Sequence, residues 1–111
     1  MLEYLFANKN VEKILVYLWL HEKANATELS RAFKSSLDPI QKTLRKLEEG
    51  GLLVSFLEGR TRVFQWNPRY PFLPEIQLLA KKTLSFLPSH IQENYYQRTK
   101  RKRPRKTGKP L

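Results

Sequence analysis

The segment from Asn25 to Trp66 constrains the fold of this chain more than any other feature. Its first part, up to Phe33, has apolar residues at helical spacing and ends at a Ser/Lys break. A longer amphipathic stretch runs from Leu37 to Glu49 and stops at two glycines, after which two alternating runs flank a short polar turn. This order of periodicities predicts two helices joined by a short turn and followed by a β-hairpin.

Residues that favour helix and strand ends set the expected boundaries inside this segment. We expect Asn25 to cap the first helix and Ser36 to cap the second, with Gly50 and Gly51 ending the second. The strands are expected at residues 52–57 and 62–66, with the turn between them. The residues expected to face the interior are Leu29, Ala32 and Phe33 in the first helix and Leu37, Ile40, Leu44 and Leu47 in the second.

Helices are also expected on both sides of this segment. Asn10 is the expected cap of an earlier helix, in which apolar residues lie on several sides, so that helix should be buried on more than one face. A short apolar cluster at residues 2–6 predicts a helical turn before it. Pro74 and Pro88 bracket a final long helix, and residues 91–96 predict a weak extra turn.

Helix, turn, helix and hairpin in this order form the layout of a winged helix-turn-helix, which places one helix in the DNA major groove. The stretches ATELSRAFKSS and IQKTLRKLEEGGLLVSFLEGRTRVFQWNP closely resemble the winged-helix transcriptional regulators of the arsenic-repressor-like and multiple-antibiotic-resistance-regulator-like superfamily. The resemblance covers roughly residues 11–87 and rests on the order of the patterns rather than on one motif. It implies an α+β fold, mostly α, with four or five helices and one hairpin wing.

A second resemblance concerns the end of this segment. The stretch RTRVFQWNPRYPFLPE is similar to winged helices found beside nucleotidyltransferase domains. This chain has no room for such a domain, which leaves a separately encoded partner as an open alternative.

The net charge of +11 is unevenly distributed along the chain. Up to residue 97 there are 13 Lys and Arg against 10 Asp and Glu, whereas residues 98–111 hold eight Lys and Arg and no acid. A stretch with so little to bury is expected to be disordered. We therefore expect a domain at residues 1–90 and a basic tail at residues 91–111. The asymmetry favours a polyanionic partner.

The composition argues against several classes of protein. Without cysteine there is no disulfide, thiolate metal site or cysteine nucleophile, which is compatible with a reducing, cytoplasmic location. The longest apolar run is too short to cross a membrane, and no secretory leader is visible. His21 and His90 lack further ligands at metal spacing, and no catalytic motif appears. We expect no metal, no cofactor, no membrane association and no enzymatic activity.

The exposed face expected for the helix at residues 37–49 carries Gln41, Lys42 and Arg45. Long donors of this kind can reach guanine, adenine or phosphate in a major groove, and the family resemblance implies base contacts from this face. Asp38 fits less well, because a carboxylate there repels phosphate. The alternative is that this is only the solvated side of an amphipathic helix.

Four further residues are candidates for contacts with DNA. Arg60 and Arg62, at and beside the hairpin tip, suit the phosphate backbone or the minor groove, although a solubilising turn explains them nearly as well. Ser35 and Ser36 can donate to phosphate, but helix capping is their simpler role.

The predicted function is a sequence-specific, DNA-binding transcriptional regulator that acts on double-stranded DNA. Surplus apolar residues in the first and last helices predict a homodimer; they are Leu2, Leu5, Trp19, Leu20, Leu78 and Leu87. One alternative is a winged helix that serves as a protein-interaction module in a larger assembly. Another is an RNA-associated protein that acts through its basic tail.

Overall fold

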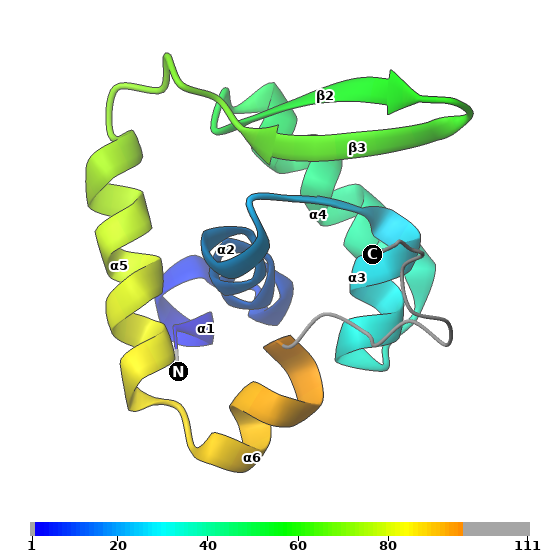
Figure 1. The fold of residues 1–111 in the computed structure, drawn as a ribbon. Helices are drawn as coiled ribbons and strands as arrows, with labels where there is room; N and C mark the ends of the chain where they lie inside the picture. The colour runs from blue at the N-terminus through cyan, green and yellow to red at the C-terminus, as the bar shows by residue number, and fades with distance from the viewer. Residues whose placement is uncertain (1, 97–111) are drawn as a thin grey trace, which may run out of the picture.

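The computed structural model describes residues 2–96 of the 111-residue chain, with Glu3 described by its backbone only. The elements, in chain order, are α1 (Glu3–Phe6), α2 (Lys9–His21), β1 (Lys23–Asn25), α3 (Ala26–Phe33), α4 (Leu37–Glu49), β2 (Leu53–Glu58), β3 (Thr61–Trp66), α5 (Leu73–Phe86), α6 (Ser89–Ile91) and a π-helical turn, η1 (Gln92–Tyr96) (Figure 1). The predicted α+β class, mostly helical with a hairpin after the helices, is confirmed.

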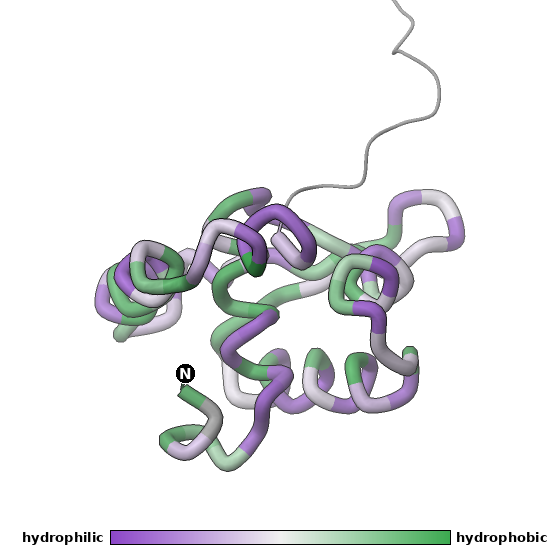
Figure 2. The backbone as a smooth tube through the Cα atoms, turned by 90° about the horizontal axis from the view of Figure 1, so that it is seen from below, coloured by the Kyte–Doolittle hydropathy of each residue, from purple (hydrophilic) through white to green (hydrophobic). Residues whose placement is uncertain are grey.

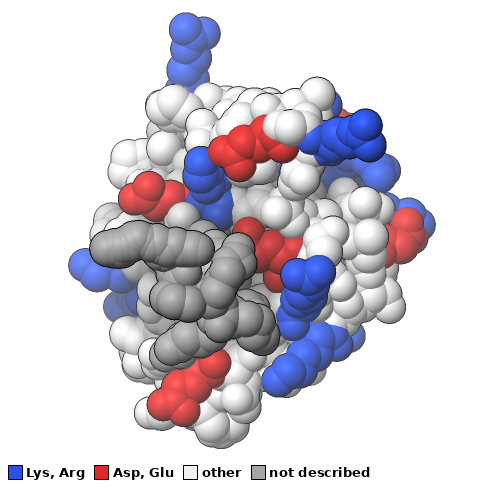
Figure 3. Space-filling view, turned by 45° about the vertical axis from the view of Figure 1, so that its right-hand side comes forward, with Lys and Arg blue, Asp and Glu red and all other residues white. Residues whose placement is uncertain are grey.

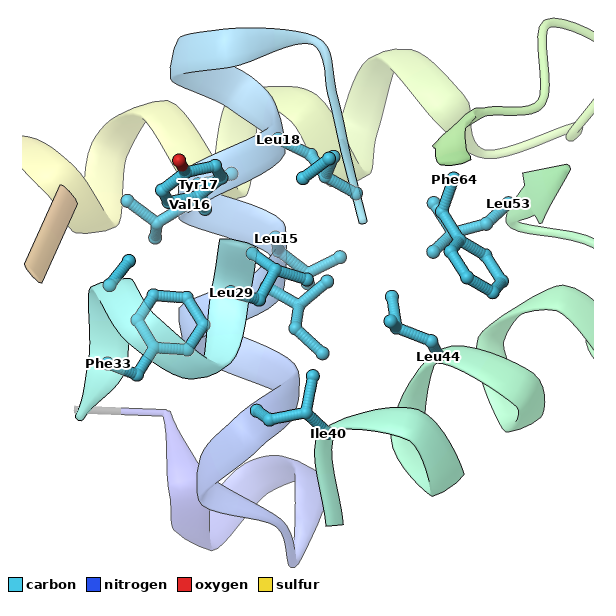
Figure 4. Close-up of a cluster of buried hydrophobic side chains, with 14 of the residues drawn as sticks. Leu15, Val16, Tyr17, Leu18, Leu29, Phe33, Ile40, Leu44, Leu53 and Phe64 are labelled. Atoms are coloured by element: carbon cyan, nitrogen blue, oxygen red, sulfur yellow. The ribbon is translucent and has the colours of Figure 1, made fainter. Parts of the chain in front are cut away.

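Helix α2 lies at the centre of the fold, with α5 on one side and α3 and α4 on the other (Figure 1). Its five consecutive residues from Ile14 to Leu18 are each at most 2% exposed. Five residues cover more than one full turn of helix, so every side of this part of α2 is packed against a neighbour. Figure 4 shows these side chains among those of α3, α4 and the sheet. The prediction that this helix is buried on more than one face is confirmed.

The cap of α2 differs from the prediction. The side-chain oxygen of Asn8 accepts a hydrogen bond from the backbone N–H of Asn10 at 2.8 Å, and the helix begins at Lys9. The prediction of Asn10 as the cap is therefore wrong, because Asn10 is buried inside the first turn. Two asparagines two residues apart have the same capping preference, and only the path of the preceding chain decides between them.

Helices α3 and α4 are joined by the tight turn that the sequence predicts. Asn25 caps α3, its side chain accepting from the backbone N–H of Glu28 at 2.8 Å. Helix α4 follows after Lys34, which adopts a left-handed conformation. Ile40 and Leu44 bury α4 against the core, and replacing either by alanine would cost about 2–5 kcal/mol.

The two ends of α4 follow the sequence to different degrees. Gly51, with φ of 89°, ends α4 in the left-handed conformation that favours glycine, as predicted. Ser36 occupies the N-cap position but makes no capping hydrogen bond through its side chain. Leu37, predicted to face the interior, is 39% exposed. The first turn of α4 is therefore less closely packed than the rest.

Strands β2 and β3 form the predicted hairpin, with Glu58 paired to Thr61 across a two-residue turn. Gly59 stands at the first turn position with φ of 65°, where a type II′ turn requires glycine. The sequence did not predict β1, which pairs antiparallel with the other edge of β3, so the sheet has the order β1-β3-β2. Three residues are too short for an alternating pattern, and β1 forms because β3 offers it a free edge.

The C-terminal elements return to the core after α5. Tyr96 is buried, its ring lies 5.9 Å from that of Phe33, and its carbonyl oxygen is 2.6 Å from Nε2 of His21. Burial raises the pKa of the Tyr96 hydroxyl far above its usual range, and the charge of Glu12 adds to the effect. Residues 91–96, where the sequence predicts a weak extra turn, are helical and pack on the core through Tyr96. Within residues 2–96, no helix is long and apolar enough to cross a membrane.

Candidate nucleic-acid interface

An open groove of about 540 Å³ lies between the start of α3, the exposed side of α4 and the tip of the hairpin. Four of the seven predicted DNA-binding residues line it: Gln41, Arg45, Arg60 and Arg62. The other lining residues are Asn25, Ala26, Thr27, Glu48, Thr61 and Phe64. The fold therefore brings together two groups of polar residues that the sequence places about 20 positions apart.

Helix α4 contributes one face to this groove. Gln41, Arg45 and Glu48 are spaced at i, i+4 and i+7, which places them in a row along one side of the helix. Arg45 is exposed, whereas Gln41 and Glu48 are half-buried. The neighbouring side, with Ile40 and Leu44, is fixed in the core. Core packing therefore orients the polar row, and no interaction of the polar row itself is needed to do so.

The hairpin contributes the opposite wall. Arg60 is the second residue of the turn and is exposed, and Arg62 follows on β3, where it pairs with Leu57 of β2. Strand β1 pairs with β3 only from Val63 to Gln65, so the tip beyond Val63 is a ribbon of two strands. This places two arginines on a projecting ribbon that faces α4.

Three predicted residues lie outside the groove. Lys42 forms an exposed ion pair with Asp38 one helical turn away, at 3.3 Å. Such a pair contributes about 0–1 kcal/mol, but it gives the Asp38 carboxylate a partner on the face of α4 where it seemed out of place. Ser35 and Ser36 lie in the turn between α3 and α4. The Ser35 hydroxyl is buried without a hydrogen-bond partner among the described residues, while Ser36 is exposed.

The sequence missed two residues that shape the groove, Glu48 and Ser55. The Ser55 hydroxyl donates to Oε2 of Glu48 at 2.6 Å and accepts from Nη1 of Arg62 at 2.9 Å. Glu48 lies near the C-terminal end of α4, beyond the residues expected to contact DNA, and nothing in the sequence marks Ser55 as functional. Only the packing of the hairpin against α4 reveals that these side chains meet.

The charge around the groove is mixed. The groove lining holds three arginines and Glu48, and on the visible part of the face in Figure 3 basic and acidic side chains lie next to one another. Near the hairpin tip, Glu58 pairs with Lys23 of β1 at 3.2 Å, and both side chains are more than half exposed. Among the described residues, Arg45 and Arg60 make no ion pair or side-chain hydrogen bond. Of the three arginines that line the groove, these two are therefore the ones without a partner to exchange for an anionic ligand.

A second surface feature lies on α1 and α5, toward the end of the molecule opposite the hairpin tip (Figure 1). Hydrophobic and hydrophilic residues alternate along α5 (Figure 2), and not all of the hydrophobic ones point inward. The large apolar side chains exposed on and beside these two helices are Tyr4 and Leu5 of α1, Phe72 just before α5, and Leu78 and Phe86 of α5. We call this set the apolar face.

The residues predicted to form a dimer are only partly on this face. Leu5 and Leu78 are 70% and 62% exposed, and Leu20 is 41% exposed. Leu2, Trp19 and Leu87 are half-buried within the monomer. The surplus of apolar surface is thus smaller than the sequence suggests, and it is centred on α1 and α5.

Metal-binding clusters and similarity to known proteins are the remaining sources of information on the site. Within residues 2–96, no three His, Asp or Glu side chains come close enough together to hold a metal ion. In comparisons with known proteins, no family model, curated protein or solved structure matches the chain significantly.

Proposed function

We propose that this chain is a sequence-specific regulator of transcription that binds double-stranded DNA as a winged helix-turn-helix protein. In this proposal α4 enters the major groove and the β2–β3 hairpin is the wing. The observation that carries it is the single groove lined by Gln41 and Arg45 of α4 and by Arg60 and Arg62 of the hairpin. One binding surface thereby combines base-reading donors with backbone-binding cations.

The dimensions of α4 suit this role. Thirteen residues make a helix of about 20 Å, and a major groove about 12 Å wide accommodates a helix with its side chains. Gln41 and Arg45 are separated along the axis by about 6 Å, close to the rise of two base pairs. Glutamine can bind adenine through two hydrogen bonds and arginine can bind guanine in the same way. Together they can read two positions of a site that lie two base pairs apart.

The free cations support the same interpretation. Arg45 and Arg60 have no partner to give up among the described residues, so binding a phosphate or a base breaks no interaction of theirs. Lys42 is paired with Asp38, but an exposed pair of this kind contributes at most about 1 kcal/mol. Lys42 can therefore exchange Asp38 for a phosphate at little cost.

We further propose that the protein acts as a homodimer through the apolar face. Apolar side chains on α1 and α5 that are 62–95% exposed have no interior role and are suited to packing against a second copy. Because this face lies away from the groove, a dimer leaves both α4 helices free to bind. Two half-sites related by two-fold symmetry are the expected target.

The experiment that tests the function is selection of bound sequences from a random pool of duplex DNA by the full chain. We expect one enriched motif with two related halves. An Arg45→Ala variant should no longer enrich this motif. The Lys82→Ala variant, which removes an exposed cation of α5, should still enrich it. Uniform recovery of the pool by the unmodified protein would contradict sequence-specific reading.

A protein-interaction module is the second candidate, favoured by the mixed charge around the groove and by the apolar face. In that case the apolar face would bind a different protein, and duplex DNA would not be bound specifically. The RNA-associated alternative rests on residues 98–111, which lie outside the described residues. Comparing random duplex DNA with structured RNA over a range of salt concentrations distinguishes it.

A further inference from the structure

Glu48, Ser55 and Arg62 form a chain of two hydrogen bonds that joins α4 to both strands of the hairpin. A serine hydroxyl has one hydrogen to donate and lone pairs to accept with. The Ser55 hydroxyl donates its hydrogen to the carboxylate of Glu48 and accepts a hydrogen bond from the guanidinium of Arg62. The order acid, hydroxyl, base fixes the direction of both bonds, and we call these three residues the relay.

The relay acts where the hairpin has least support. Strand β1 covers β3 only from Val63 inward, so Arg62 is the first residue of β3 toward the tip without a β1 partner. A ribbon of two strands is marginally stable by itself. Arg62 of this ribbon donates a hydrogen bond to Ser55, and Ser55 is bound to α4 through its hydrogen bond to Glu48. The relay therefore restrains the projecting tip relative to α4.

We propose that Glu48 and Ser55 are positioning residues that hold Arg62 and the hairpin tip at a fixed distance from α4, so that the groove is formed before DNA binds. This inference rests on the proposed function. A guanidinium has five N–H donors, and the bond to Ser55 uses one of them. Four donors remain for a phosphate, on a side chain that loses less conformational freedom on binding because it is already held.

The placement of Glu48 follows from this role. A carboxylate in a groove for DNA repels phosphate, and an uncharged acceptor would avoid that repulsion. A charged acceptor gives shorter and stronger hydrogen bonds, as the 2.6 Å distance to Ser55 illustrates. The charge of Glu48 thus weakens the attraction for DNA, but it orders the hairpin better than an uncharged acceptor would.

Two pairs of substitutions isolate the relay. Ser55→Ala removes the hydroxyl, and Ser55→Thr keeps it on a residue that favours strands. Glu48→Ala and Glu48→Gln both remove the charge, but only glutamine keeps an oxygen that accepts from Ser55. The difference within each pair reports the hydrogen bonds, and comparison of Glu48→Gln with the unmodified protein reports the charge.

The first measurement uses the free protein. Amide hydrogen exchange at residues 59–62 should be faster in Ser55→Ala and Glu48→Ala than in Ser55→Thr and Glu48→Gln, while exchange in α2 stays the same. If either alanine variant fails to fold, Arg62→Ala breaks the relay at an exposed position and should give the same local change. Equal exchange within both pairs would overturn the proposal.

The second measurement is affinity for duplex DNA. Ser55→Ala should bind all duplexes about three- to tenfold more weakly than Ser55→Thr, which is the worth of one ordinary hydrogen bond. Glu48→Gln should bind at least as tightly as the unmodified protein, and Glu48→Ala more weakly than Glu48→Gln. Equal affinities within both pairs of variants would overturn the proposed role of the relay in DNA binding.

The two measurements also separate this inference from the proposed function. If the unmodified protein binds no duplex, the proposed function and the DNA role of the relay both fail. The exchange difference would then still support a relay that holds the hairpin against α4.

Discussion

The groove and the apolar face present opposite chemistry at opposite ends of one small domain. The groove is lined by amide, guanidinium and carboxylate groups on elements that core residues such as Leu44 hold in place. The apolar face carries exposed leucine and aromatic side chains on α1 and α5. A charged ligand suits the groove, whereas another apolar surface suits the apolar face. Single variants on either surface can therefore test the proposed DNA binding and the proposed dimerisation separately.

The largest expected effect comes from the basic tail, which should act on every duplex alike. Truncation after Gln97 should leave the fold and sequence preference intact and lower affinity for all DNA. Each neutralised phosphate contributes about 0.9 to the slope of log K against log salt. If half of the eight cations engage, the slope should fall by roughly three to four units. Binding over a salt series, on selected DNA, random DNA and structured RNA, measures this.

The position of the truncation matters, because Tyr96 belongs to the core. Truncation after His90 should cost about 3–5 kcal/mol in stability, as loss of a large buried aromatic does, and should lower Tm, unlike truncation after Gln97. For the truncation after Gln97, an unchanged salt slope on DNA together with a large loss of affinity for RNA would favour the RNA-associated alternative.

Disruption of the apolar face should produce the next largest effect. Leu78→Asp places a charge on a residue that is 62% exposed, so the monomer should fold while the dimer dissociates. Loss of the second half-site should weaken binding to a two-part site by about a hundredfold. Light scattering at tens of micromolar measures the mass. The control is Leu57→Asp, a substitution at a similarly exposed leucine of the hairpin, and this variant should remain dimeric. A monomer mass for the unmodified protein would refute the proposed dimer.

Substitutions in the groove should have smaller but sequence-dependent effects. Arg45→Ala and Gln41→Ala should each cost about 1–3 kcal/mol on the selected site and much less on random DNA, because base contacts are lost. Neither change should alter the dimer mass. Fluorescence anisotropy on both DNAs gives the comparison, with Lys82→Ala as the control. Equal losses on both DNAs would mean that these side chains contact only the backbone.

The smallest effect is expected at the hairpin tip. Arg60→Ala should weaken binding a few-fold and lower the salt slope by about one, with little change in sequence preference, because the tip meets phosphate rather than base edges. Arg69→Ala, an exposed arginine outside the groove, is the matched control. A change in the selected motif would argue against a backbone role for the tip.

The features that the sequence predicts correctly depend on neighbours in the chain. The cap of α3 by Asn25 and the end of α4 at Gly51 are local matters of hydrogen bonding and backbone freedom. The hairpin follows from alternation around a glycine turn. Gln41 and Arg45 fall on one face because 3.6 residues make a turn.

The features that the sequence missed depend on residues distant in the chain. Strand β1 exists because β3 has an open edge, and Tyr96 is buried because Phe33 and His21 lie beside it. The contact between Glu48 and Ser55 requires the hairpin to lie on α4. The periodicity of a sequence does not report such tertiary contacts, which explains why neither β1 nor the relay was predicted.

The most direct test is a titration of the isotope-labelled full chain with the selected duplex, followed by NMR of assigned backbone amides. We expect the largest shifts at Gln41, Arg45 and Arg60, on two elements that meet only in the folded protein, and little change at Leu78 of α5. Shifts centred on α1 and α5, or no shifts within residues 2–96, would contradict binding of DNA by the groove.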